Sequence, residues 1–145
     1  MYKVKMDGQT LYYPGDKEAV LTNPTLNLQT GYAGTFEFSV PPNNPLYDKI
    51  KNRSSMVSVF RDTTELFYGE VRKQPKVDRY RNKNVYCAGA MSFLADSIQP
   101  QAEYHDMTPR QMLETFLDIH NNQVEDRKKI YLGKVTITDA NDSLY

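Results

Sequence analysis

The chain has 145 residues with equal numbers of basic and acidic side chains, 18 of each, together with one Cys, two His and no Trp. This length suits one domain, or one domain with part of another. The sequence holds no apolar run near the roughly 18 residues of a membrane span, and no secretory signal follows Met1. A single cysteine, Cys87, excludes an internal disulfide and a cysteine zinc site. Length and composition therefore predict a soluble protein without a membrane partner.

The formal charge of zero hides two segments of opposite sign. Residues 72–83 hold six bases and one acid, and the bases are Arg72, Lys73, Lys76, Arg79, Arg81 and Lys83. Residues 103–126 hold six acids and one basic side chain, and the acids are Glu103, Asp106, Glu114, Asp118, Glu125 and Asp126. Opposite patches on one chain favour ordered self-association over the binding of a polyanion.

The first forty residues predict antiparallel strands. Residues 2–6 alternate apolar and basic side chains, and Asp7-Gly8 separates them from a second run at 10–13, which is the pattern of a tight β-hairpin. Another strand is expected over 25–29, before two glycines end it. Aromatic and aliphatic side chains then alternate with polar ones over 35–40, which predicts a half-buried strand.

The middle of the chain is the richest in strand-forming residues. A short helical turn or loop is expected over 45–51, and antiparallel strands follow over 56–60, 66–72, 77–81 and 85–90, the last two joined by a turn at 82–84. Gly69 lies inside a strand, where a residue without a side chain is typical of a bulge or a bend in a curved sheet. Several short antiparallel strands with such curvature predict a barrel or a closed sandwich.

The periodicity changes after Pro100, where we place a domain boundary. We expect residues 1–99 to form an antiparallel β-barrel-like domain. Residues 100–145 would begin a second, small α+β domain that we expect to be truncated. The predicted fold class is therefore α+β and dominated by β-structure.

The second domain is expected to open with a helix. Thr108, Pro109 and Gln111 have the pattern of a capping box with proline at the first helical position. Apolar residues at helical spacing follow, so we predict a helix over about 109–120. A strand is expected after it, around residues 131–137.

Side chains that carry catalysis or bind metals do not occur in a convincing pattern. His120 would lie in the last turn of the helix, where imidazole favours the negative end of the dipole. Cys87 lies in the middle of a strand and is expected to be a buried structural thiol. Asp139, Asn141 and Asp142 resemble part of a calcium loop but lack the glycine and distal Glu of an EF-hand, so we expect an Asx turn. We therefore predict no catalytic, cofactor or metal site.

The basic segment 72–83, with Tyr80 and Tyr86, is the most distinctive local feature. Bases interleaved with tyrosines can follow phosphates and stack on nucleobases. The isoelectric point of 6.7, however, is below the value above about 9 that is usual for nucleic-acid-binding domains. A solvated edge that Lys and Arg protect against aggregation, or an assembly contact, explains the same residues. We expect the latter roles for the six bases, and nucleic-acid binding stays a less favoured alternative.

Six short segments, taken together, carry a resemblance to a known family. They are Ala33–Phe38, Pro45–Ile50, Phe67–Val71, Leu94–Pro100, His120–Val124 and Gly133–Asp142. In this order and spacing they resemble the N-terminal region of siphophage tail proteins of the prophage endopeptidase tail, or tail-associated lysin, family. The resemblance spans nearly all of the chain.

The resemblance implies a baseplate-hub-like fold in which three copies form a ring that closes the tail tube. Such a ring docks on the distal tail protein at the virion tail tip, after synthesis in the cytoplasm of the bacterial host. From the charge balance of the chain, we expect no sequence-specific binding of nucleic acid. One departure concerns the strand glycine: a basic residue often follows it in the family, whereas Glu70 follows Gly69 here. That departure affects any contact that the basic residue makes in the family, and it leaves the expected fold unchanged.

Many relatives carry a C-terminal domain that cleaves peptidoglycan, and none of it lies within these residues. We therefore expect a structural virion component that is not an enzyme and needs no cofactor. An alternative is the leading segment of a tail-associated peptidoglycan hydrolase whose catalytic domain lies downstream.

Overall fold

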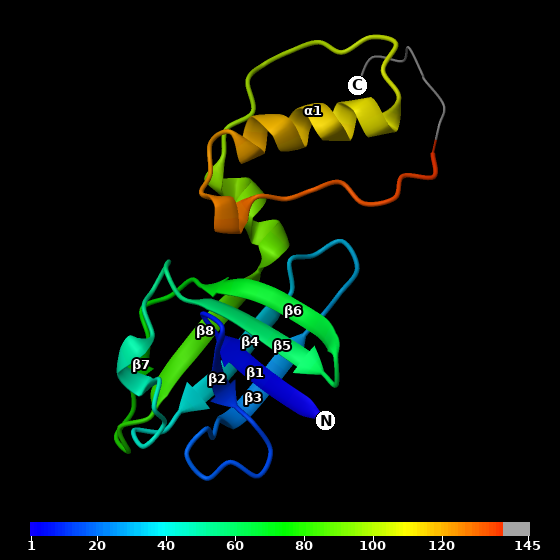
Figure 1. Ribbon diagram of the computed structural model, residues 1–145. Coiled ribbons are helices and arrows are strands. Elements are labelled where there is room, and N and C mark those ends of the chain that lie inside the picture. Colours follow the sequence, from blue (N-terminus) through cyan, green and yellow to red (C-terminus); the bar gives the residue numbers. More distant parts are fainter. Residues whose placement is uncertain (138–145) are drawn as a thin grey trace. The chain divides into compact units, whose positions relative to one another are not determined.

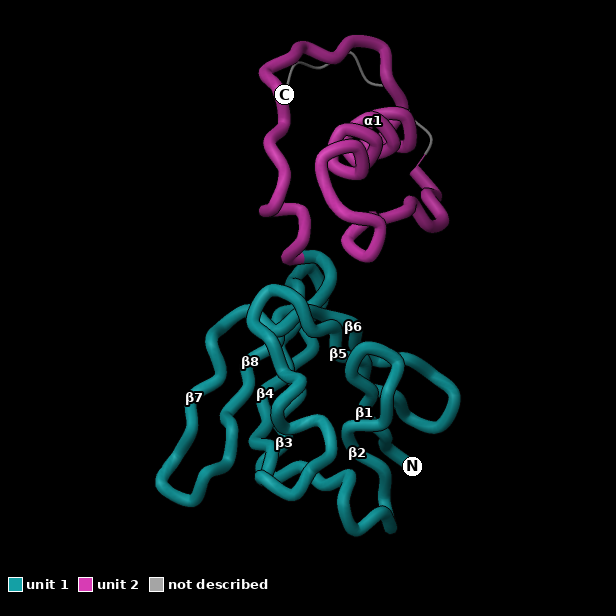
Figure 2. Tube along the Cα trace, turned by 60° about the vertical axis from the view of Figure 1, so that its left-hand side comes forward, with its two compact units in different colours: residues 1–91 teal, residues 92–145 magenta. Residues whose placement is uncertain are grey.

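The computed structural model describes residues 1–137, and the chain divides into two compact units between Met91 and Ser92 (Figure 2). All eight strands of the described chain belong to the first unit, and its one α-helix belongs to the second. The protein is therefore an α+β fold dominated by antiparallel β-structure, as the sequence predicted.

The first unit is one antiparallel sheet that curls into a half-barrel (Figure 1). Its strands are β1 (Tyr2–Met6), β2 (Gln9–Tyr12), β3 (Thr22–Asn27), β4 (Thr35–Val40), β5 (Met56–Arg61), β6 (Thr64–Val71), β7 (Lys76–Val77) and β8 (Lys83–Gly89). Neighbours follow the order β2-β1-β5-β6-β8-β4-β3, and β7 pairs with β8 beside this path. The predicted curvature is confirmed, and in the described chain β2 and β3 are the open ends of this strand order. Pro24 and a break in register lie in β3, and both features make an edge strand a poorer template for further pairing.

The hairpin of β1 and β2 forms as predicted. Asp7 and Gly8 both have positive φ, 49° and 80°, which is the backbone that a two-residue hairpin turn requires. The turn is also tied to β5, because the Asp7 N–H donates to the Met56 carbonyl (2.9 Å) and the Met56 N–H donates to Asp7 Oδ1 (2.8 Å). These bonds hold the hairpin in register with the rest of the sheet.

The core of the first unit lies on the concave face of the sheet. Aromatic side chains form its centre, with the Phe36 ring centroid 4.8 Å from that of Phe38 and 6.0 Å from that of Phe67. Cys87 is fully buried in the same cluster, and burial raises the pKa of its thiol. The prediction of a buried structural thiol is therefore confirmed.

Two glycines face each other where β6 pairs with β8. Gly69 lies opposite Gly89, and a Cβ on Gly69 would lie 2.3 Å from the Ala88 carbonyl oxygen. A Cβ on Gly89 would lie 1.8 Å from the Ala33 carbonyl oxygen. The Phe67 ring is within 2.6 and 3.3 Å of these two positions. Gly69 thus permits close approach of backbone segments in the curved sheet, and the break in register between β5 and β6 lies elsewhere, near the start of β6.

The connection between β7 and β8 is a tight turn, so the strand predicted over 77–81 is wrong. The Asp78 carboxylate accepts hydrogen bonds from the backbone N–H groups of Tyr80 (2.8 Å) and Asn82 (3.0 Å) and from the Asn82 amide (3.1 Å). Arg81 has the left-handed backbone, with φ of 68°. Although partial desolvation opposes ionisation, hydrogen bonds from Asn82 and Tyr80 hold the pKa of Asp78 below its usual value. The Asx turn replaces strand pairing here.

The second unit contains the predicted helix, α1 (Pro109–Asn121), beside the short 3₁₀ helices η2 (Ala90–Asp96), which begins at the end of the first unit, and η3 (Asp126–Lys128). The capping box is present, because the Gln111 N–H donates to Thr108 Oγ1 (3.3 Å) and the Thr108 N–H donates to Gln111 Oε1 (2.9 Å). Pro109 is the first helical residue. The helix start is therefore read correctly from the sequence.

The strand expected around residues 131–137 is absent from the described chain. The backbone of Ile130 bonds instead to a side chain of α1, with its N–H donating to Asn121 Oδ1 and its carbonyl accepting from Asn121 Nδ2, both at 2.8 Å. No neighbouring strand is available in this unit to continue such pairing within residues 92–137. The Asx turn predicted at Asp139, Asn141 and Asp142 lies outside the described residues.

The division between the units lies N-terminal to the predicted boundary at Pro100. Residues 92–99, which lie between the two boundaries, pack within the second unit. Phe93 is buried, and Asp96 Oδ2 lies 2.9 Å from Lys128 Nζ. The Lys128 ammonium also lies 5.9 Å from the centroid of the Phe93 ring. These contacts join residues that are far apart in sequence, and composition alone does not indicate them.

Candidate functional site

The six bases predicted as assembly contacts fall into two groups with different environments. Two of them serve the fold of the first unit. Arg72 Nε lies 3.1 Å from Glu70 Oε2, and the Glu70 side chain is fully buried while that of Arg72 is 13% exposed. Arg72 therefore compensates a buried carboxylate and is not a surface residue.

Lys83 is the second base with a structural role. Its ammonium donates to the Tyr47 carbonyl (2.6 Å), lies 3.4 Å from Asp48 Oδ1 and sits 4.0 Å from the centroid of the Tyr47 ring. These contacts anchor the 3₁₀ helix η1 (Tyr47–Lys49) to β8. The Tyr47 hydroxyl in turn donates to the Arg81 carbonyl. The segment around Tyr47 therefore contacts both the β7–β8 turn, at Arg81, and strand β8, at Lys83.

The other four bases are exposed, and we call them the basic edge: Lys73, Lys76, Arg79 and Arg81. Two apolar residues between them are exposed as well, Val77 by 57% and Tyr80 by 67%. The Arg79 guanidinium lies 4.6 Å from the centroid of the Tyr80 ring, a stacking distance for a cation on an aromatic face. The one acid of this segment, Asp78, has its carboxylate engaged by the turn. The basic edge thus presents cations and a tyrosine on a firmly held turn.

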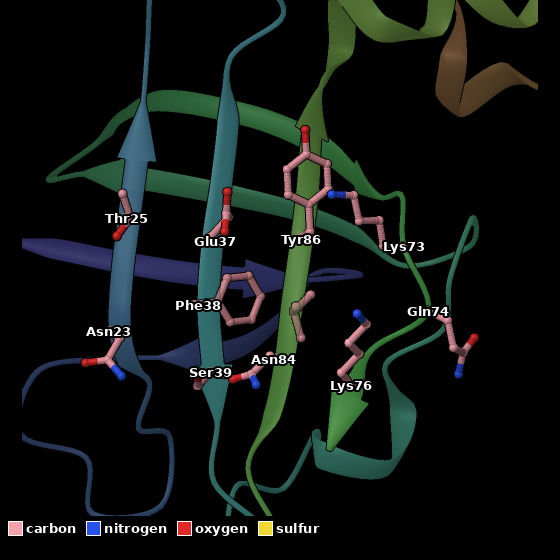
Figure 3. Close-up of a pocket in the computed structure, with 11 residues that line it drawn as sticks. Asn23, Thr25, Glu37, Phe38, Ser39, Lys73, Gln74, Lys76, Asn84 and Tyr86 are labelled. Carbon is pink, nitrogen blue, oxygen red and sulfur yellow. Dashed lines mark hydrogen bonds between the residues drawn. The ribbon is translucent and has the colours of Figure 1, made fainter. Parts of the chain in front are cut away.

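A polar pocket of about 370 Å³ lies beside the basic edge, on the outer face of β3, β4 and β8 (Figure 3). Thr25, Glu37 and Tyr86 form a row across these strands, which matches their pairing in the sheet. Lys73 and Lys76 line the side of the pocket, and the Lys73 ammonium lies 4.1 Å from the centroid of the Tyr86 ring. Two ammonium groups and one carboxylate leave the pocket with an excess of positive charge.

A larger, mainly apolar groove of about 770 Å³ lies between the two open edges of the sheet. Tyr2 and Tyr12 from the β1–β2 hairpin line one side, and Pro24 and Leu26 from β3 line the other. No local motif in the sequence indicates this groove, because it follows from the order of the strands. Tyr2 and Leu28 line this open groove, and about half of the surface of each is exposed, 52% and 55%.

The geometry offers no catalytic arrangement in the described part of the chain. His120 is fully buried, with Nδ1 2.8 Å from Ser97 Oγ and Nε2 3.1 Å from the Lys128 carbonyl oxygen, so it joins three segments of the second unit. His105 Nε2 lies 3.7 Å from Glu103 Oε2 at the surface. Residues 1–137 hold no cluster of three or more His, Cys, Asp or Glu that could bind a metal ion. Among the helices of this region, none has the length and apolar character to cross a bilayer.

Comparison with known proteins adds one informative likeness. No protein-family model matches the chain, and no curated protein matches it. Among solved structures, the chain is similar to the 43 kDa tail protein of prophage MuSo2 from Shewanella oneidensis, with a TM-score of 0.54 and 15% sequence identity. The match covers 82% of this chain and 38% of that protein, so the chain spans well under half of its neighbour. The chain therefore shares its fold with a phage tail protein.

Proposed function

We propose that this chain is a structural component of a phage tail and that it is not itself an enzyme. The observation that carries the proposal is the fold shared with the 43 kDa tail protein over 82% of the chain.

A more specific role follows from the six sequence segments between Ala33 and Asp142. We propose that copies form a hub at the tail tip, where a ring of three closes the tail tube and attaches to the distal tail protein. A ring of identical subunits uses heterologous contacts, so each subunit presents two different faces. The opposite charges of residues 72–83 and 103–126 are suited to such contacts.

The oligomeric state of the intact gene product tests the hub role. We expect multi-angle light scattering to give three times the mass of one chain, and we expect the trimer to bind the distal tail protein of the same phage. The distal tail protein of an unrelated phage is the control for non-specific binding. A product that stays monomeric at high concentration, and that does not bind the cognate distal tail protein, contradicts the hub role.

A further inference from the structure

We infer that the basic edge of one copy binds the acidic outer face of helix α1 in a second copy of this chain. The acidic face consists of Glu114 and Asp118. The inference rests on the proposed function, because it names the contact through which copies associate head to tail.

Hydrogen bonds tie the backbone of the turn that carries Arg79 and Arg81, although the side chains of the basic edge are exposed. The Asp78 carboxylate closes the turn, and the Tyr47 hydroxyl binds the Arg81 carbonyl from outside it. A surface that is already ordered loses less conformational entropy when it binds a partner. Arg79 and Tyr80 are in addition the residue types that most often carry the binding energy of protein interfaces.

The acidic face of α1 breaks two local rules of helix stability. Glu114 and Asp118 are both exposed and lie one turn apart, where like charges repel. Arg110 Nη1 lies 2.9 Å from Glu114 Oε1 and offsets one of the two carboxylates. Asp118 lies in the last turn, where the negative end of the helix dipole disfavours an anion. Residues that oppose local stability are expected where a surface serves a partner.

The two surfaces match in chemistry as well as in sign. The guanidinium groups of Arg79 and Arg81 are planar donors that bind carboxylates in pairs of hydrogen bonds. Tyr80, exposed by 67%, would meet Leu113, which is exposed by 43% beside Glu114 on α1. An apolar contact surrounded by charged pairs is the usual anatomy of a protein interface.

The charge of the whole chain favours a second copy over a nucleic acid as the partner. Residues 1–91 carry 13 basic and 9 acidic side chains, whereas residues 92–145 carry 5 basic and 9 acidic ones. A polyanion would be attracted by the first segment and repelled by the second. Two copies in a head-to-tail contact bring the opposite charges together.

Charge reversal in the intact gene product tests the contact. The edge variant carries Arg79→Glu and Arg81→Glu, the helix variant carries Glu114→Arg and Asp118→Arg, and a combined variant carries all four changes. We expect sedimentation velocity at low salt to show self-association weakened at least about tenfold in the edge variant and in the helix variant. The combined variant should recover association to within a few-fold of the unmodified protein, because attraction between the two surfaces is restored with the signs exchanged.

A matched control separates this contact from a general effect of net charge. Lys17→Glu with Lys51→Glu reverses two exposed lysines outside the basic edge of the first unit, and it should leave association within about twofold. Circular dichroism of every variant confirms that each is folded. If the edge variant associates like the unmodified protein, or if the combined variant does not recover, the inference is overturned while the hub role stands. An unmodified protein that never self-associates overturns both.

Discussion

Replacing Gly89 by Ala is expected to destabilise the sheet of residues 1–91 by about 3 kcal/mol or more. The added Cβ would lie 1.8 Å from the carbonyl oxygen of Ala33, so a backbone segment must move. Gly69→Ala should have an effect of similar size, because its Cβ would lie 2.3 Å from the Ala88 carbonyl oxygen. Hydrogen exchange measured by mass spectrometry reports the loss directly, as faster exchange in peptides from β6 and β8.

The control is Gly31 in the same unit, which requires glycine for its backbone conformation and not for lack of space. Gly31 has φ of 81°, and a Cβ there would meet nothing within 4 Å. Gly31→Ala should therefore cost only the backbone strain of the left-handed conformation, roughly 1 kcal/mol. Equal losses in Gly31→Ala and Gly89→Ala would show that the close approach of backbone segments at Gly89 does not support the curved sheet.

Removing one member of the Glu70–Arg72 pair is expected to cost about 3–5 kcal/mol. Arg72 is only 13% exposed, so Glu70→Ala leaves a largely buried guanidinium without the carboxylate that compensates its charge. Arg72→Ala leaves the fully buried Glu70 carboxylate without the guanidinium of Arg72 that compensates its charge. The free energy of unfolding comes from urea-dependent hydrogen exchange in the peptide that covers β6.

Two further variants separate burial of charge from loss of packing. The double variant Glu70→Leu with Arg72→Met should lie close to the unmodified protein, because removing both charges together avoids an uncompensated one. Glu114→Ala, which removes an exposed partner of Arg110, should change stability by less than about 0.5 kcal/mol. Single changes at Glu70 and Arg72 that each cost no more than the Glu114 control would refute the structural role of the pair.

The parts of the fold that depend on local chemistry could be predicted from the sequence. Asp7-Gly8 specifies a hairpin turn because both residues tolerate positive φ, and the turn forms where expected. Thr108 and Gln111 specify a helix start because each satisfies a backbone N–H group of the other. In both places, the residues that determine the structure are neighbours in the chain.

The parts that depend on contacts between distant residues could not be predicted. The sequence predicts a strand over 77–81, where the structure has a turn, because the sequence pattern does not reveal that the Asp78 carboxylate accepts from nearby backbone N–H groups. The packing of Phe93 within the second unit likewise has no signal in the sequence. The open edges of the half-barrel follow from the strand order, which hairpin patterns alone do not give.

The candidate site also has a part that the sequence predicts and a part that depends on contacts between distant residues. Its position in residues 72–83 could be read from composition, because clustered bases are visible in any sequence. The separation of Arg72 and Lys83 from the basic edge could not, since it depends on the burial of Glu70 and on the carbonyl of Tyr47. Whether the remaining bases form an assembly contact is a proposal that the charge-reversal variants test.

We propose that this chain is built into a phage tail and has a structural role there. Quantitative mass spectrometry of purified virions, combined with immunogold labelling of the same particles, tests this role. We expect the protein to be a stoichiometric virion component, present in three copies per particle, with gold at the tail tip. Absence of the protein from purified virions, although it is present in the lysate of the infected host, would rule out the proposed role.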